Sequence, residues 1–205
     1  MTQKQCNAFV HGLHEILKRA LKQAGVVPAN NEREVPRPVD DDLQKEKYSG
    51  KKKRHSVKNA VIIAACCLIV YVSRTFSGRI HDKTIADNEY FVLRTKYKYT
   101  IPSGYTLVQD TGYQGYQPEG VIIIQPQKKP RGKELTQEQK ESNRQISSYR
   151  VRVEHAIGGV KRYRIVKDEC RLRKNDFVEG VFLYCAALHN FRLNTRPFAY
   201  KNKLT

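Results

Sequence analysis

Tryptophan is absent from this sequence, methionine occurs once, and acidic residues are scarce: 20 Asp and Glu stand against 38 Lys and Arg. The formal net charge at pH 7 is +18, and the pI is near 9.8. A charge excess of this size indicates a polyanionic partner, the alternative being a basic protein with scattered charges. With 205 residues, the chain can form one domain with a proper core plus a small appendage.

Long hydrophobic runs are also missing. The longest apolar stretch, AVIIAACCLIVYV at residues 60–72, is too short to span a bilayer, which takes about 20 residues. The amino end, MTQKQCNAFVHGL, is polar and contains no long apolar signal segment. The sequence therefore predicts no membrane span and no signal peptide. The stretch at 60–72 is interpreted as two buried strands of one sheet.

Cysteine pairs with zinc-site spacing are absent too. The five cysteines are odd in number and form no CxxC motif: Cys6, Cys66, Cys67, Cys170 and Cys185. This pattern argues against a zinc site and favours buried free thiols in a reducing compartment. We therefore expect a cytoplasmic location.

Basic residues are present in clusters. One block comprises Lys51, Lys52, Lys53 and Arg54, and another comprises Lys128, Lys129, Arg131 and Lys133. Residues 144–174 hold ten Lys and Arg against three Asp and Glu, a local charge of +7. This clustering argues against scattered charge. It predicts weak, strongly salt-dependent binding to the backbone of duplex DNA, without sequence specificity.

The segment SSYRVRVEHAIGGVKRYR places Arg150, Glu154 and Lys161 at spacings of four and seven residues. On an α-helix these positions share one face, so a carboxylate would lie between two cations. Asp110 follows a short apolar run in TLVQDTGYQGY, where a strand would end. Two carboxylates placed in this way can serve metal-assisted chemistry on phosphodiesters. Spacing alone also permits an ordinary Arg150–Glu154 ion pair and a turn-forming Asp110.

Five motifs follow one another between residues 48 and 198: YSGKKKRHSVKN, SRTFSGRIHDKTIAD, QDTGYQGY, RVEHAIGGVKRYRI and LHNFRLNTRP. Together they resemble bacterial insertion-sequence transposases of the DDE type. The resemblance implies an α/β, ribonuclease-H-like domain with a mixed sheet flanked by helices. It also implies three acids that hold two Mg²⁺ or Mn²⁺ ions for DNA cleavage and strand transfer. Asp110 matches the second acid and Glu154 the third.

The same resemblance implies how the site meets DNA. Arg150 and Lys161 match basic residues that flank the third acid, and with Arg162 and the two basic blocks they are the expected DNA contacts. His81-Asp82 matches a pair with a supporting role near the site, although the residues themselves favour a helix cap and a hydrogen-bonded histidine. The expected partners are transposon ends and target DNA, in a nucleoid-associated protein.

The first acid of the family is missing. When Glu32-Arg33 is aligned with the family's Glu-Arg, Ala29 takes the place of the acid, and Pro28 interrupts the short apolar run before it. This pattern predicts an internal deletion that removed the central first strand together with its acid.

Three parts are predicted. Residues 1–25 resemble the one remaining helix of an amino-terminal helix-turn-helix region, and residues 26–47 form a polar linker. Within that linker, Asp40-Asp41-Asp42 lack strand character and do not replace the acid. Residues 48–205 form a partial ribonuclease-H-like domain. The first helix carries an apolar face: Phe9, Leu13, Ile16, Leu17 and Leu21.

Two details of the later helices are predicted. Gly158-Gly159 in the Glu154 helix costs about 1 kcal/mol per glycine relative to alanine, which suggests either close approach of another backbone or a bound strand, or a kink. The last helix is predicted to bury an apolar stripe: Phe177, Val181, Cys185, Leu188 and Phe191.

The sequence therefore predicts a transposase by family that is catalytically inactive as a lone chain. Two carboxylates do not bridge two ions about 3.5–4 Å apart. Three alternatives remain open: a working enzyme that obtains another acid from this chain or a second one, a DNA-binding remnant that interferes with a full-length relative through mixed oligomers, and a poorly folded decayed product.

Overall fold

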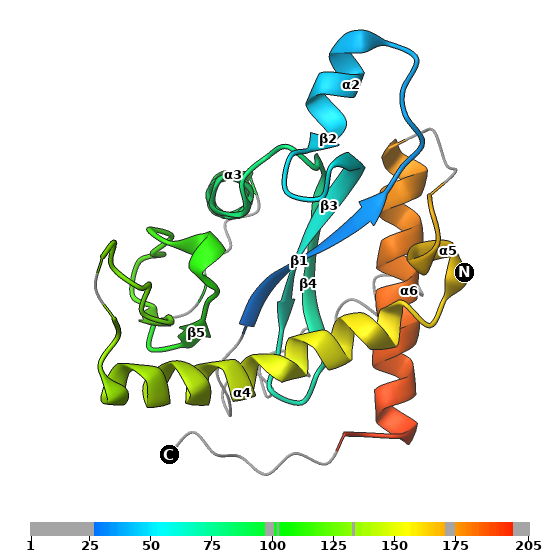
Figure 1. Cartoon of the computed structure of the whole chain (residues 1–205). Helices are drawn as coiled ribbons and strands as arrows, with labels where there is room; N and C mark the ends of the chain where they lie inside the picture. Colours follow the sequence, from blue (N-terminus) through cyan, green and yellow to red (C-terminus); the bar gives the residue numbers. More distant parts are fainter. Residues whose placement is uncertain (1–26, 97–100, 102, 133, 171–174, 199–205) are drawn as a thin grey trace.

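The computed structural model describes residues 27–96, 101, 103–132, 134–170 and 175–198. It is a mixed α/β structure (Figure 1), as predicted. The strands are β1 (Val27–Glu34), β2 (Tyr48–Ser49), β3 (Arg54–Ile63), β4 (Ile69–Ser77), β5 (Thr106–Val108) and β6 (Ile122–Ile124). The helices are α2 (Asp41–Lys47), α3 (Asp82–Lys96), the 3-10 helix η1 (Thr111–Tyr113), α4 (Gln137–Val160), α5 (Arg164–Lys167) and α6 (Asn175–Thr195).

Strand β3 organises the main sheet. It pairs antiparallel with β1, β2 and β4, while β5 and β6 form a separate parallel pair that lies against β1. The long helices α4 and α6 pack on each other and cross at a steep angle in Figure 1. Their buried side chains join those of β3, β4 and β5 in one hydrophobic core.

The prediction of a missing first strand was wrong. β1 pairs with β3 along its whole length, from Val27 opposite Ile63 to Glu34 opposite Ser56. The strand was not predicted because its composition is polar. Its burial depends on distant partners rather than on its own hydrophobicity. Arg33, only 3% exposed, donates to Asn59 Oδ1 at 2.7 Å and to the carbonyl of Val178 in α6 at 3.2 Å.

The predicted polar linker at residues 26–47 therefore contains a strand, and it also contains helix α2. Pro28 is tolerated because it is the second residue of β1, near the strand start. Asp40 caps α2 by accepting a hydrogen bond from the Leu43 amide at 2.8 Å. The predicted helix at residues 1–25 lies outside the described residues.

The apolar stretch at residues 60–72 does form two strands, as predicted. β3 and β4 are joined by a tight turn in which Cys67 has a positive φ of 66°. Within the turn, the Ala64 amide donates to Leu68 O and the Cys67 amide donates to Ala64 O, both at 2.9 Å. Among the described residues, no helix is long and apolar enough to cross a membrane.

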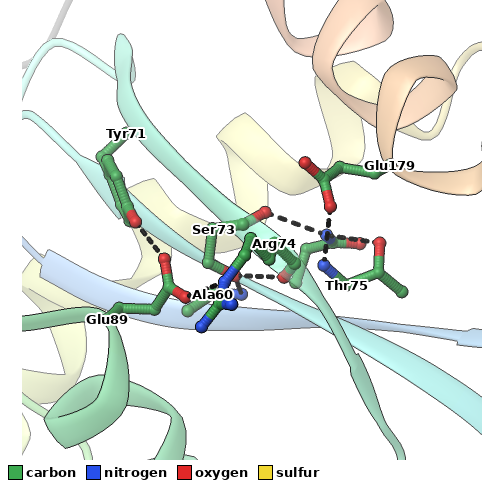
Figure 2. A network of polar contacts seen from close by, with 8 residues as sticks. Ala60, Tyr71, Ser73, Arg74, Thr75, Glu89 and Glu179 are labelled. Carbon is green, nitrogen blue, oxygen red and sulfur yellow. Dashed lines mark hydrogen bonds and ion pairs between the residues drawn. The ribbon is translucent and has the colours of Figure 1, made fainter. Parts of the chain in front are cut away.

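Strand β4 is held by two helices through acidic side chains (Figure 2). Glu89 of α3 is buried and accepts hydrogen bonds from the Tyr71 hydroxyl and from Nε of Arg74, the latter at 3.1 Å. Glu179 of α6 accepts one from the Thr75 amide at 3.1 Å. Burial and the neighbouring Glu89 raise the pKa of Tyr71, so the phenol stays protonated and keeps donating. These contacts satisfy polar groups of β4.

The predicted apolar stripe of the last helix was confirmed at Val181 and Cys185, which pack in the core, but not at Leu188 and Phe191. α6 buries the side chains of Val178, Phe182, Cys185, Ala186 and Leu193, whereas Leu188 and Phe191 are exposed. Apolar residues occur around most of this helix, so their spacing does not identify the face that meets the core.

Gly159 lies where α4 meets α6. Close approach of a neighbouring group accounts for the glycine, as predicted, but that group is a side chain of α6 rather than a backbone. A Cβ at Gly159 would lie 2.2 Å from Nδ1 of His189 on α6. A Cβ at Gly158 would meet nothing within 4 Å. Of the two glycines, only Gly159 is required by packing.

The fully buried His189 makes stability depend on pH. Its Nε2 lies 3.1 Å from the carbonyl of Cys67, but burial outweighs this contact and lowers the pKa of His189 below 6.5, and Arg192 and Arg162 act in the same direction. Because the folded protein resists protonation, stability is complete above about pH 6.5 and falls as the pH drops below that value.

We expect urea denaturation from pH 7.5 to pH 5 to show this loss of stability. In His189→Gln, the free energy of unfolding should fall less steeply with decreasing pH. The exposed His81 provides the control, because His81→Gln is expected to leave the slope unchanged. An unaltered pH dependence in His189→Gln would assign the effect to other groups.

Candidate active site and basic surfaces

Asp110 follows the end of β5 by two residues, after a strand as predicted. Its carboxylate caps η1 by accepting a hydrogen bond from the Thr111 amide at 2.7 Å. The same carboxylate pairs with Arg150 of α4, with Nη2 of Arg150 2.8 Å from Oδ2 of Asp110. The two side chains are 44% and 27% exposed for Asp110 and Arg150 respectively, so the pair is accessible from solvent. Arg150 therefore joins the helix to the strand end.

Glu154 follows Arg150 by four residues on α4 and is exposed. Four residues correspond to about 6 Å along a helix, so the Glu154 backbone lies roughly one turn from the helix position that contacts Asp110. The structure thus brings the segments that carry these two acids together. The simpler alternative of an Arg150–Glu154 pair differs from what is seen, because Arg150 contacts Asp110.

Lys161 is the C-cap of α4 and lies in a mixed electrostatic environment. Burial lowers its pKa and Lys52 lowers it further, while Glu154 and Glu32 act in the opposite direction. Lys52 Nζ lies 3.9 Å from Glu32 and α4 contacts β1, so the end of α4, the β2–β3 turn and the second half of β1 are neighbours.

Ala29 is the third residue of β1 and lies opposite Val61 of β3. Its methyl group is partly buried and packs on the hydrophobic core. By strand alternation it shares a face with Asn31 and Arg33, which are 1% and 3% exposed. Residues 27–34 therefore form a strand, and Ala29 contributes a methyl group to it.

The donor set does not fit two divalent ions. Two-metal sites need several carboxylates around ions about 3.5–4 Å apart. No group of three or more His, Cys, Asp or Glu that could hold a metal occurs within the described part of the chain. Asp110 already has an arginine as its counter-charge. Asp40 caps α2, and Asp41 and Asp42 lie in the first turn of that helix.

A supporting contact that the sequence did not reveal involves Lys58 of β3. Its Nζ lies 3.4 Å from Oδ1 of Asp82 and 3.1 Å from the carbonyl of Ile80. Asp82 in turn lies against the η1 loop, because a Cβ on Gly112 would be 3.1 Å from Oδ2 of Asp82. Asp82 therefore both begins α3 and borders the loop that follows Asp110. The sequence did not predict the Lys58 contact, because the alternation of residues in a strand indicates which face a side chain lies on but not which residue it contacts.

Tyr113 lies beneath this loop. It is 2% exposed, and its hydroxyl has no hydrogen-bond partner in the structure. Burial raises the pKa of Tyr113, and the nearby Asp82 and Asp110 raise it further. The phenol of Tyr113 therefore stays neutral in the vicinity of these two carboxylates.

The predicted basic residues form two groups near opposite ends of α4. Lys51, Lys52 and Lys53 are exposed in the β2–β3 turn, next to Arg54, and the coupling of Lys52 to Lys161 places this turn near the α4 C-cap and Arg162. The loop with Lys128, Lys129 and Arg131 is tied to the first half of α4 by two hydrogen bonds between Gln127 and Asn143, at 2.8 and 3.0 Å. Lys133 lies outside the described residues.

Several of these cations already have acidic neighbours. Arg54 pairs with Glu34, Lys129 pairs with Glu134, and Lys52 Nζ lies 3.9 Å from Glu32. The first two pairs are exposed and contribute only about 0–1 kcal/mol, so they can open to a phosphate, whereas the Glu32 side chain is only 13% exposed. Lys51 and Lys53 extend from the same exposed turn.

Comparison with known proteins places the chain in a family. Residues 32–190 match the model of a DDE superfamily endonuclease. The chain is 29% identical over 183 residues to a probable transposase for insertion sequence element IS702 from Microchaete diplosiphon. That match covers 86% of this chain and 63% of the relative, so the chain spans less than two thirds of it. No solved structure matches the chain. The chain therefore belongs to the DDE superfamily endonucleases and is related to insertion-sequence transposases.

Proposed function

We propose that this chain is a ribonuclease-H-like, transposase-derived protein that binds DNA but does not cleave it alone. The observation that carries the proposal is the methyl group of Ala29 on an intact β1, and the sequence resemblance aligns this residue with the first acid. The remaining acids, Asp110 and Glu154, are retained, but the former is paired with Arg150. The loss is thus confined to one side chain rather than to a strand.

The strand arrangement supports the ribonuclease-H-like assignment. β4, β3 and β1 are adjacent and antiparallel, and the parallel pair of β5 and β6 lies against β1. This order places β1 centrally, with the Asp110 strand as its neighbour. The acid on α4 then approaches from a helix, as the resemblance to DDE transposases implies.

The basic residues support DNA as the partner. Lys51, Lys52, Lys53, Arg54, Lys161 and Arg162 lie near the C-terminal end of α4, and Lys128, Lys129 and Arg131 lie near its other half. A 24-residue helix is about 36 Å long, roughly one turn of B-DNA, so the two groups can contact phosphates along a single duplex. Such contacts position the duplex without specifying sequence.

An intact core favours binding over decay. The described residues enclose one large hydrophobic cluster that includes Phe182, Leu107 and Val153. A chain that keeps its core and its basic surface can compete for the DNA of a full-length relative. We therefore favour the binding remnant, with interference as its consequence, over the poorly folded product.

Salt dependence tests the proposed DNA contact. We expect the triple variant Lys51→Gln, Lys52→Gln, Lys53→Gln to lower the affinity for a 30-base-pair duplex at least about ten-fold. Its plot of log K against log salt should be shallower by about 2–3 units, because each lost phosphate contact removes about 0.9. Fluorescence anisotropy over a salt series measures both quantities.

The control variant removes two positive charges elsewhere, so its losses are compared per charge removed. Lys83 and Arg94 of α3 pair with Asp87 and Glu119, and their replacement by glutamine is expected to leave the slope unchanged. Equal losses in both variants would mean that net charge, rather than the β2–β3 turn, governs binding.

A further inference from the structure

Helix α6 exposes an uncharged apolar stripe. Tyr184, Leu188 and Phe191 are 70%, 49% and 65% exposed, and their spacing of four and three residues places them on one helix face. Gly180 and Ala187 share that face and add no charge. We call Tyr184, Leu188 and Phe191 the α6 stripe. In a chain of which 28% is charged, such a face indicates a covering partner.

The chain itself carries a segment of matching chemistry. The first 26 residues lie outside the described structure, and their sequence repeats apolar residues at helical spacing: Phe9, Leu13, Ile16, Leu17 and Leu21. Lys4, Lys18 and Lys22 lie on the opposite side of that helical projection. Such a segment needs one apolar surface and leaves its basic side free.

The attachment point lies at the correct end of the molecule. Val27 pairs with Ile63, and Ile63 pairs with Ile69. The backbone of Ile69 exchanges two hydrogen bonds with the Asn190 side chain of α6, at 2.9 and 2.8 Å. Two strand spacings, about 10 Å, therefore separate Val27 from the edge of the sheet at which α6 packs. Val27 therefore begins β1 at the level of Asn190 on α6, and Leu188 and Phe191 lie at the same level on the exposed side of that helix.

We propose that residues 3–24 dock as an amphipathic helix on the α6 stripe of their own chain. Effective concentration favours this occupant over a second copy. A segment joined directly to β1 is present at an effective concentration of the order of millimolar, far above the micromolar concentration of another chain. The net charge of +18 also opposes association of two copies.

Limited trypsin digestion of the full chain tests this docking. We expect cleavage after Lys18, Arg19 and Lys22 to be about ten-fold faster in the double variant Leu188→Glu, Phe191→Glu, because proteolysis follows the population of the open form. Mass spectrometry quantifies each cleavage, and cleavage after Lys51 to Lys53 is the internal reference. The control Ile122→Glu changes another exposed apolar residue and should leave the rates unchanged.

Two further measurements keep the test decisive. The variant Leu13→Glu, Leu17→Glu alters only the segment, so it cannot unfold the described core, and it should show the same acceleration. Equal cleavage rates in all variants would overturn the proposal. A concentration-dependent dimer in sedimentation velocity, abolished by Leu188→Glu, Phe191→Glu, would also overturn it and assign the stripe to a second copy.

Discussion

Ala29→Asp is expected to convert an inert chain into one that nicks supercoiled DNA in the presence of Mn²⁺ or Mg²⁺. The substitution places a carboxylate on β1, the strand that contacts the Asp110 strand. With Asp110 and Glu154 it would complete the acid set that a two-metal site requires. The wild-type chain should show no nicking above background, and EDTA should abolish the activity of the variant. Conversion of supercoiled to relaxed plasmid on an agarose gel measures the effect.

Three controls define this result. Ala29→Asn matches the size of aspartate without its charge and should stay inactive. Glu154→Gln or Asp110→Asn in the Ala29→Asp background should reduce nicking at least about 100-fold, the scale typical of lost charge stabilisation at a reacting centre. A wild-type chain that nicks DNA, and loses this in Glu154→Ala, would show that another acid already serves.

Stability must be checked in parallel, because Ala29 packs on the core. A cooperative thermal transition in Ala29→Asp would show that the new carboxylate is accommodated. Isothermal titration with Mn²⁺ then separates metal binding from turnover. An Ala29→Asp chain that folds and binds no more metal than Ala29→Asn would contradict the proposed site.

Gly159→Ala is expected to destabilise the protein by about 1–3 kcal/mol, the usual cost of overpacking. A Cβ there would lie 2.2 and 2.4 Å from Nδ1 and Cε1 of His189, whose ring is fully buried and cannot move into solvent. The ring is further held by the contact of its Nε2 with the Cys67 carbonyl. The steric cost therefore exceeds the gain of about 1 kcal/mol that alanine brings to a helix.

Gly158→Ala provides the matched control, because a Cβ there meets nothing within 4 Å. It should stabilise α4 by up to about 1 kcal/mol through helix propensity alone. Urea denaturation of both variants gives the two free energies of unfolding. If the two substitutions have effects of the same sign and size, the contact between Gly159 and His189 does not limit the packing of α4 on α6.

The sequence predicted features that depend on short-range patterns. The hairpin at residues 60–72 and the position of Asp110 after a strand followed from local apolar runs, and both are present. The helix that carries Arg150, Glu154 and Lys161 followed from spacing. Each of these signals lies within a window of about 20 residues.

Features that depend on distant partners were not predictable in this way. β1 is stabilised by β3 and by hydrogen bonds of Arg33 to residues 26 and 145 positions away, so its own sequence has the composition of a polar linker. Apolar residues of α6 occur on both its buried and its exposed sides, so only packing against the sheet determines which side is buried. Arg150 forms its ion pair with Asp110 rather than with Glu154, because the fold brings the segment after β5 next to α4.

The ion pair between Arg150 and Asp110 has a consequence for how this surface meets nucleic acid. A bare cluster of carboxylates repels phosphates until cations neutralise it. Here the guanidinium is a permanent internal counterion, attached to the same scaffold as the acid it neutralises. The negative charge of Asp110 is therefore already balanced before any ion from solution reaches this part of the surface.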